Sequence, residues 1–162
     1  VIVANFLLSK KKQTNFLANM DIIACCAPTG IFLGRIANFI NSELWGKTTT
    51  LPWGIVFPNG GDLPRHPSQI YEAILEGLIL FLIMNYVYRK SSSQYGLTSC
   101  YFLIFYGFFR IFVEFYREPD SHLGYIVGDK ISMGILLSIP MIVLGIILRF
   151  KLDVGFRRNN KK

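Results

Sequence analysis

Four long apolar runs, separated by polar segments, constrain the fold of this chain more than any other feature. They cover residues 22–41, 67–88, 97–116 and 131–150. Each reaches the length of about 20 helical residues that crosses the hydrocarbon core of a bilayer. Charged residues make up only 17% of the chain, against about 25% in an average soluble domain. The pattern predicts an all-α fold, namely a polytopic bundle of transmembrane helices.

A shorter apolar run opens the chain at residues 1–8 and leads into Lys10, Lys11 and Lys12. A signal peptide carries its positive charge before its apolar region, not after it. We therefore interpret this run as the tail of a spanning helix, and the chain as a fragment that lacks its N-terminal helices. The expected architecture is about four full spans plus this tail, in a single integral membrane domain over residues 1–162.

The apolar run at residues 22–41 is interrupted by Pro28, Gly30 and Gly34. A proline inside a helix removes one backbone hydrogen bond, and glycine lowers helix stability. We therefore expect a kinked or broken helix in this run.

The charges at the ends of the runs indicate how the chain crosses the membrane. The net charge of +7 could suggest a nucleic-acid partner, but no basic stripe with interleaved aromatic residues is present, so we exclude one. Three alternate ends are cationic, at Lys10–Lys12, Arg89–Lys90 and Lys151. The positive-inside rule places these ends in the cytoplasm, with residues 151–162 as a basic cytoplasmic tail. The polar stretch at residues 47–66 is then a periplasmic loop.

With this orientation, the polar side chains of the runs gather near the outer surface, while the inner halves are almost entirely apolar. The residues are Arg35, Asn38, Glu43, His66, Gln69, Tyr71, Glu72, Arg110, Glu114 and Arg117. A charge inside a membrane is costly unless it is paired or binds a ligand. Glu72 by itself needs no ligand, because an acidic residue near a helix N-terminus is favoured by the helix dipole.

Tyr106, Arg110, Glu114 and Arg117 recur at i, i+4, i+8 and i+11, which predicts one polar stripe along a helix. A structural interpretation is an Arg110–Glu114 pair that helps helices associate. With Arg35 and Arg117, however, the cluster holds more guanidinium groups than a self-neutralising pair requires. Because arginine suits bidentate binding of phosphate, we favour an anionic lipid headgroup as the ligand.

Other catalytic chemistries have weaker support in the sequence. His66 could act as a general base, but it precedes Pro67, and a residue that fixes the entry to a helix is the favoured interpretation. The three cysteines, Cys25, Cys26 and Cys100, lie inside apolar runs without metal-ligand spacing and are interpreted as packing residues. We expect no metal and no cofactor.

Four segments that together cover essentially the whole chain resemble signature motifs of the bacterial prolipoprotein diacylglyceryl transferase family. They are Gly34-Arg35…Asn38-Phe39-Ile40-Asn41…Glu43…Trp45-Gly46; Leu63-Pro64-Arg65-His66-Pro67-Ser68-Gln69…Tyr71-Glu72…Leu75-Glu76-Gly77; Tyr106-Gly107…Phe109-Arg110…Glu114…Arg117…Pro119-Asp120; and Ile131-Ser132-Met133-Gly134…Leu137-Ser138-Ile139-Pro140-Met141.

The resemblance implies transfer of the diacylglyceryl group of phosphatidylglycerol to the lipobox cysteine of a prolipoprotein signal peptide. It also implies a multi-pass protein of the bacterial inner membrane, surrounded by membrane lipid, with its active face toward the periplasm. The catalytic residues it implies are Arg35, Arg110, Glu43 and Tyr106. The substrate-binding residues it implies are Arg35, Asn38, Gly46, His66, Gln69, Glu114 and Arg117.

The sequence departs from the family pattern in two ways. The His-Gly-Gly segment of the family, often assigned the base role, would lie before Val1 and is absent, and Ala37, Ser42 and Lys47 replace two usual glycines and a common arginine. Three alternatives stay open: a non-catalytic lipid or anion transporter, a structural subunit held together by Arg110–Glu114, and an inactive fragment. A transporter would carry polar residues along its whole depth, whereas here they stop near mid-membrane.

Overall fold

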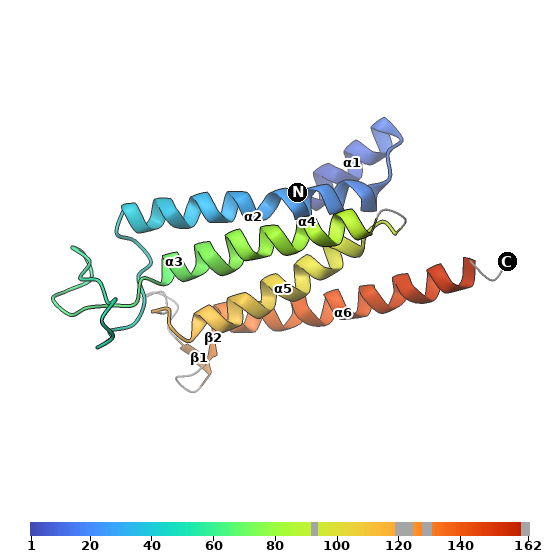
Figure 1. Ribbon diagram of the computed structural model, residues 1–162. Coiled ribbons are helices and arrows are strands. Elements are labelled where there is room, and N and C mark those ends of the chain that lie inside the picture. The colour runs from blue at the N-terminus through green and yellow to red at the C-terminus, as the bar shows by residue number, and fades with distance from the viewer. Residues whose placement is uncertain (92–93, 119–124, 128–130, 160–162) are drawn as a thin grey trace.

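The computed structural model describes residues 1–91, 94–118, 125–127 and 131–159, most of them in long helices (Figure 1). In chain order the elements are α1 (Ile2–Lys12), α2 (Phe16–Ile40), α3 (Ser68–Glu72), η1 (Ala73–Ile79), α4 (Leu80–Lys90), α5 (Leu97–Glu114), β1 (Tyr125–Val127), β2 (Ile131–Ser132) and α6 (Met133–Asn159). The short antiparallel pair β1–β2 is the one sheet in the described part of the chain. The predicted helical bundle is confirmed.

Within the described part of the chain, four helices are long and apolar enough to cross a membrane, at residues 16–40, 68–90, 97–114 and 133–155. The chain is therefore a multi-pass membrane protein, as predicted. Many large apolar side chains on these helices face outward, among them Leu33, Phe108 and Phe150. Such an outer surface suits lipid, whereas soluble proteins rarely expose large contiguous apolar patches. The last helix, α6, runs beyond the predicted end of its span and into the predicted tail.

Helix α2 is continuous from Phe16 to Ile40, so of the two predicted forms, kinked or broken, the broken one is wrong. It begins earlier than predicted because the Asn15 side chain caps it, accepting hydrogen bonds from the Leu17 and Ala18 amides. The helix passes through Pro28 and loses one backbone hydrogen bond there, which a membrane span tolerates where neighbouring groups compensate. The irregular backbone lies instead in the next span, where η1 is a π-helix.

Helix α1 folds back on α2 as an antiparallel hairpin (Figure 1). Asn5 and Ser9 are buried in this contact. The Asn19 side-chain Nδ2 donates to the Ser9 hydroxyl over 3.1 Å, and the Ser9 hydroxyl donates to the Asn5 side-chain Oδ1 over 3.3 Å. Hydrogen bonds between polar side chains are a common means of joining helices in membranes. Whether α1 is the tail of a longer span stays a prediction.

The continuous helix formed by α3, η1 and α4 packs against both α2 and α5, and α6 packs along α5 (Figure 1). Two glycines permit close approaches between these helices. A Cβ atom on Gly77 would lie 2.7 Å from the Phe32 Cβ, and one on Gly107 would lie 2.7 Å from a side-chain carbon of Ile142. Small residues at helix contacts are typical of membrane bundles. The result is that the ends of α2 and α5 flank the beginning of the helix between them.

We call the end of the bundle where α2 and α5 finish the loop end, and the other the opposite end. At the opposite end Asp21 is buried and ties α2 to the start of α5. Its carboxylate accepts hydrogen bonds from the Gly96 amide (2.6 Å), the Ser99 amide (2.8 Å) and the Ser99 hydroxyl (2.7 Å). The first amides of a helix need acceptors and favour a negative charge. Asp21 thus caps α5 from a neighbouring helix, a contact that the sequence analysis missed.

The segment between α2 and α3 folds into a layer over the loop end. Its backbone forms isolated bridges, including Gly46 with Arg117 and Thr48 with Arg65. The buried Phe57 ring stacks on Trp45, with ring centroids 6.1 Å apart. This layer therefore connects the end of α2, the start of α3 and the chain that follows α5.

Candidate functional site: an ion cluster at the loop end

Six charged side chains meet at the loop end of the bundle, and we call them the ion cluster. They are Arg35 on α2, Glu72 on α3, Glu76 on η1, Arg110 and Glu114 on α5, and Arg117 just after α5. The sequence analysis predicted that five of them, Arg35, Glu72, Arg110, Glu114 and Arg117, lie at one level of the membrane. The structure brings these five together and adds Glu76. Of the predicted stripe, Tyr106, Arg110 and Glu114 lie on α5, whereas Arg117 lies beyond its end.

Glu72 is the centre of the cluster and is completely buried. Its Oε2 lies 2.8 Å from the Arg35 Nε, and its Oε1 lies 2.8 Å from the Arg110 Nη1 and 4.0 Å from the Arg117 Nη1. One carboxylate therefore joins guanidinium groups from three parts of the chain. Removing a single partner would leave a buried charge uncompensated, which is strongly destabilising.

Glu76 is equally buried but is held differently. Its carboxylate lies 3.6 Å from the Arg110 Nη1 and 4.0 Å from the Arg35 Nη2. Among the described residues, neither of its oxygens has a hydrogen-bond partner. Glu76 lies within the π-helical segment η1, and such segments are rare and frequent at functional sites.

Glu114 completes the cluster from the same helix as Arg110. Its Oε2 lies 3.1 Å from the Arg110 Nη2, which is the pair that the sequence analysis considered as a structural alternative. Gly134, at the start of α6, packs directly on the Glu114 carboxylate, because a Cβ atom there would lie 2.7 Å from its Cδ. The start of α6 thus confines Glu114 to its place beside Arg110.

The charge balance of the cluster differs from the one expected from the sequence. The sequence analysis inferred an excess of guanidinium groups over carboxylates. The structure instead places three arginines against three glutamates. The inference failed because Glu72 was interpreted as an ordinary residue of a helix start, and Glu76 was not considered as a partner at all. The sequence did contain a pattern that could have revealed these partners. Two acidic residues lie one turn apart in an apolar span, where unpaired acids are costly, so both should have been expected to pair with cations.

A small pocket of about 220 Å³ opens beside the ion cluster. Its lining consists of Ile31, Gly34, Arg35, Asn38 and Tyr106. The Tyr106 ring stacks on Phe102 with ring centroids 5.6 Å apart, which fixes its position on α5. Asn38 and Tyr106 therefore share one pocket with Arg35, as the prediction of a common site requires.

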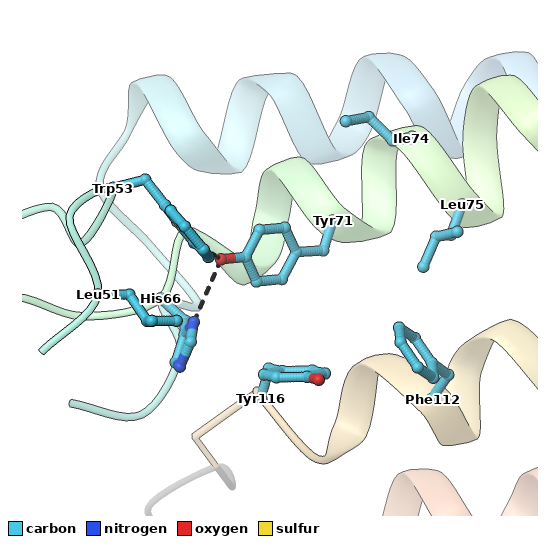
Figure 2. A pocket seen from close by; sticks show the side chains of 8 residues that line it. All are labelled: Leu51, Trp53, His66, Tyr71, Ile74, Leu75, Phe112 and Tyr116. Atoms are coloured by element: carbon cyan, nitrogen blue, oxygen red, sulfur yellow. Dashed lines mark hydrogen bonds between the residues drawn. The ribbon is translucent and has the colours of Figure 1, made fainter. Parts of the chain in front are cut away.

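A second, mostly apolar pocket of about 390 Å³ lies between the loop layer and the outer turns of α3, η1 and α5 (Figure 2). It is lined by Leu51, Trp53, His66, Tyr71, Ile74, Leu75, Phe112 and Tyr116. Figure 2 shows the Tyr71 hydroxyl between the Trp53 and His66 side chains. Trp53 Nε1 donates to that hydroxyl over 2.8 Å, and His66 Nδ1 lies 3.2 Å from it. Because Tyr71 precedes Glu72 directly, this aromatic pocket and the ion cluster adjoin the same turn of α3.

His66 thus lines the aromatic pocket and is not part of the ion cluster. Partial burial lowers the pKa of its imidazole below the ordinary value, because the charged form loses hydration. Its main chain also contributes to the loop layer, since the His66 carbonyl accepts a hydrogen bond from the Gly46 amide over 2.9 Å. This contact supports the interpretation of His66 as a residue that fixes the entry to the helix.

Two further predicted residues, Glu43 and Gly46, lie in the loop layer, and Gln69 at the start of α3 contacts it; all three lie outside the ion cluster. The Glu43 side chain is exposed and forms no ion pair with the described residues. Gln69 is completely buried, and its Nε2 donates to the Glu43 carbonyl over 2.5 Å. A Cβ atom on Gly46 would lie 2.5 Å from the Tyr116 carbonyl oxygen, so only glycine fits this backbone approach. These residues hold the layer on the helices.

Comparison with known proteins assigns the chain to a family. A model of the family described as "Prolipoprotein diacylglyceryl transferase" matches residues 1–151. A relative from Pasteurella multocida is 50% identical over 162 residues, which is 100% of this chain and 58% of the relative. One from Mannheimia succiniciproducens is 52% identical over 145 residues, or 90% of this chain and 54% of the relative. One from Vibrio parahaemolyticus is 53% identical over 148 residues, or 91% and 54%.

All three relatives carry the name phosphatidylglycerol–prolipoprotein diacylglyceryl transferase. The chain spans about half the length of the curated relatives it matches. The resemblance seen in the four sequence motifs is thereby confirmed over most of the chain, and the protein belongs to the prolipoprotein diacylglyceryl transferase family.

Proposed function

We propose that this chain provides the phosphate-binding part of a phosphatidylglycerol–prolipoprotein diacylglyceryl transferase. The observation that carries the proposal is the convergence of Arg35, Arg110 and Arg117 in one buried cluster beside a pocket. Guanidinium groups bind phosphate oxygens in a bidentate way, and this electrostatic attraction is stronger in a site that excludes water. The names of the relatives supply the substrates that such a cluster would serve.

In the proposed reaction the thiolate of the lipobox cysteine attacks the carbon of the diacylglyceryl group that bears the phosphate. A carbon–sulfur bond forms, the carbon–oxygen bond to phosphate breaks, and glycerol phosphate leaves with the bonding electrons. Preorganised cations stabilise the charge that develops on such a leaving group. Arg35 and Arg110 would contact the phosphate, and Glu114 would orient Arg110 from 3.1 Å. Asn38 and Tyr106 would position the headgroup from the small pocket.

The attacking group must be a thiolate, which an electropositive environment favours. Arginines in contact with the bound substrate would supply that environment. We assign Glu43, Gly46 and His66 of the loop layer, and Gln69 of α3, to the shape of the site rather than to contact with the reacting atoms.

We further propose that the aromatic pocket accepts the apolar part of the signal peptide. The pocket adjoins the turn that carries Glu72, so a peptide bound there would lie next to the ion cluster (Figure 2). Its lining is apolar apart from polar groups on the Trp53, His66, Tyr71 and Tyr116 side chains. The apolar h-region of a signal peptide matches this surface in chemistry.

The orientation that we propose is that of a bacterial inner-membrane protein with the loop end toward the periplasm. Residues 47–66 would then be a periplasmic loop, and residues 151–162 a cytoplasmic tail. In support, Lys10–Lys12 and Arg89–Lys90 lie at the opposite end of the bundle, as the positive-inside rule requires of a cytoplasmic end (Figure 1).

The test is transfer of labelled diacylglycerol from phosphatidylglycerol to a lipobox peptide by the chain in membranes. It is run with the chain alone and with the chain co-expressed with the part of the Pasteurella relative that it does not match. We expect cysteine-dependent transfer that Arg110→Ala abolishes and that Arg89→Ala, at the opposite end, leaves unchanged. No transfer in either form, with insertion verified, would overturn the proposal and favour a lipid-binding or structural protein.

A further inference from the structure

We propose that the ion cluster takes up one proton, on Glu76, when it binds a phosphodiester anion. This inference rests on the proposed function, because it assumes that phosphatidylglycerol binds at the cluster. It assigns to Glu76 the role of a buried acid that contacts the substrate. No covalent bond changes in this step: a carboxylate, a proton and a phosphodiester monoanion become a carboxylic acid beside the bound monoanion.

The charge balance of the cluster is the first argument. Among the described residues, the three guanidinium groups of the cluster face three carboxylates before any ligand binds, so the cluster has no excess of positive charge there. A phosphodiester adds one negative charge, so the cluster with its ligand would hold one uncompensated charge in a buried site. Such a charge is costly in an environment of low dielectric constant, and a site of this kind responds by changing its protonation. Uptake of one proton restores neutrality.

The contacts then decide which carboxylate takes the proton. Glu72 is held by two contacts of 2.8 Å, and Glu114 by one of 3.1 Å, all to guanidinium nitrogens. Glu76 is held only by contacts of 3.6 and 4.0 Å. Both of its buried oxygens lack a hydrogen-bond partner in the described part of the chain, whereas only one oxygen each of Glu72 and Glu114 does. Protonation of Glu76 therefore gives up less favourable interaction with guanidinium groups than protonation of Glu72 or Glu114 would.

The groups around Glu76 favour this assignment. Arg35 approaches it from α2 and Arg110 from α5, while Glu72 lies one turn earlier on the same helix. Glu114, Arg117 and the Tyr106 hydroxyl are the other titratable groups of the site in the described structure. A phosphate that engages Arg35 and Arg110 lies next to Glu76, and a protonated carboxyl group can donate a short hydrogen bond to its oxygen.

The inference has a measurable consequence. If free Glu76 is ionised and bound Glu76 is protonated, one proton is taken up for each phosphodiester that binds. By linkage, the affinity then falls about tenfold for each unit of increasing pH over that range. A site that binds the anion through arginines alone would show no such slope.

The experiment measures binding of short-chain phosphatidylglycerol to the purified full chain in detergent by titration calorimetry. Titrations between pH 5 and pH 9, in buffers of different ionisation enthalpy, give both affinity and proton uptake. We expect uptake of about one proton by the wild type. We expect no uptake and a pH-independent affinity for Glu76→Gln, which removes the charge and keeps the shape. Asp21→Asn, which removes the charge of a buried acid outside the ion cluster, is the matched control and should retain the uptake.

The possible results separate this inference from the proposed function. Binding of phosphatidylglycerol without proton uptake, or uptake that persists in Glu76→Gln, overturns the inference alone. Failure of the folded wild type to bind phosphatidylglycerol at any pH overturns the proposed function and the inference together. Thermal unfolding of the variants checks their folding. An uncharged short-chain diacylglycerol serves as the ligand control and should cause no proton uptake.

Discussion

Buried charges lie at both ends of the bundle, and they are held in different ways. At the opposite end, Asp21 accepts three hydrogen bonds of 2.6–2.8 Å, two of them from backbone amides at the start of α5. At the loop end, the ion cluster brings six charged side chains together but leaves both oxygens of Glu76 without a hydrogen-bond partner among the described residues. Both oxygens of Asp21 are hydrogen-bonded, whereas the ion cluster pairs its charges without completing its hydrogen bonds.

The difference separates a structural charge from one that is available for a ligand. A buried carboxylate whose oxygens are all bonded stabilises one conformation and has little to offer a substrate. A cluster that balances its charges but does not complete its hydrogen bonds retains donors and acceptors that a ligand can use. The pocket beside Arg35 and Tyr106 supports this interpretation, because it lies at the loop end. The following predictions test the contrast.

Arg110→Ala should have the largest effect. It leaves Glu72, Glu76 and Glu114 without a shared cation, which we expect to lower the free energy of unfolding by about 3–5 kcal/mol. Binding of phosphatidylglycerol should be lost as well. Denaturation in detergent and lipid binding measure the two effects, and Arg110→Lys should restore part of the stability. Wild-type lipid binding by Arg110→Ala would mean that the cluster only holds the helices together and does not bind lipid.

Asp21→Ala should destabilise the bundle without affecting the ligand site. It removes three hydrogen bonds to a buried charge, so we expect a loss of about 3 kcal/mol in the free energy of unfolding. Asp21→Asn, which retains one acceptor oxygen, should lose less. Lipid binding by folded Asp21→Ala should match the wild type, and a selective loss of binding would show that the contrast between the two ends is wrong.

Gly134→Ala should perturb the ion cluster from its outer side. The added Cβ atom would lie 2.7 Å from the Glu114 carboxylate and would push it away from Arg110. We expect about 1–3 kcal/mol of destabilisation, which is typical of overpacking, together with weaker lipid binding. Gly155→Ala is the matched control on the same helix, because its Cβ atom would meet nothing within 4 Å. Equal free energies of unfolding and equal lipid binding in the two variants would contradict the prediction.

The smallest effect concerns His66. Its pKa is lowered by burial, so the unfolded chain binds a proton more readily than the folded one. Stability should therefore be complete above the unfolded pKa of about 6.5 and should decrease as pH falls below it. Thermal unfolding between pH 5 and pH 8 should show this loss, and His66→Gln should reduce it. An unchanged pH profile in His66→Gln would assign the loss to another group.

Much of the fold could be predicted from residue patterns because the bilayer imposes simple rules on length and polarity. The four spans follow from apolar runs of sufficient length. The shared level of Arg35, Arg110 and Arg117 follows from the cost of charges in apolar surroundings. The family followed from motifs such as Gly34–Gly46, which depend on residue identity rather than on packing.

Tertiary structure alone decided which charges meet across different helices. Glu72 and Glu76 lie on a different helix from the arginines that they contact, so only the packing of α2 and α5 against η1 brings them into the cluster. The same is true of Asp21, whose partners Gly96 and Ser99 are more than 70 residues away in sequence. Sequence patterns report local period and polarity, whereas a pair between helices depends on their rotation and separation. For that reason the sequence determined the level of the site, and the fold determined its charge balance.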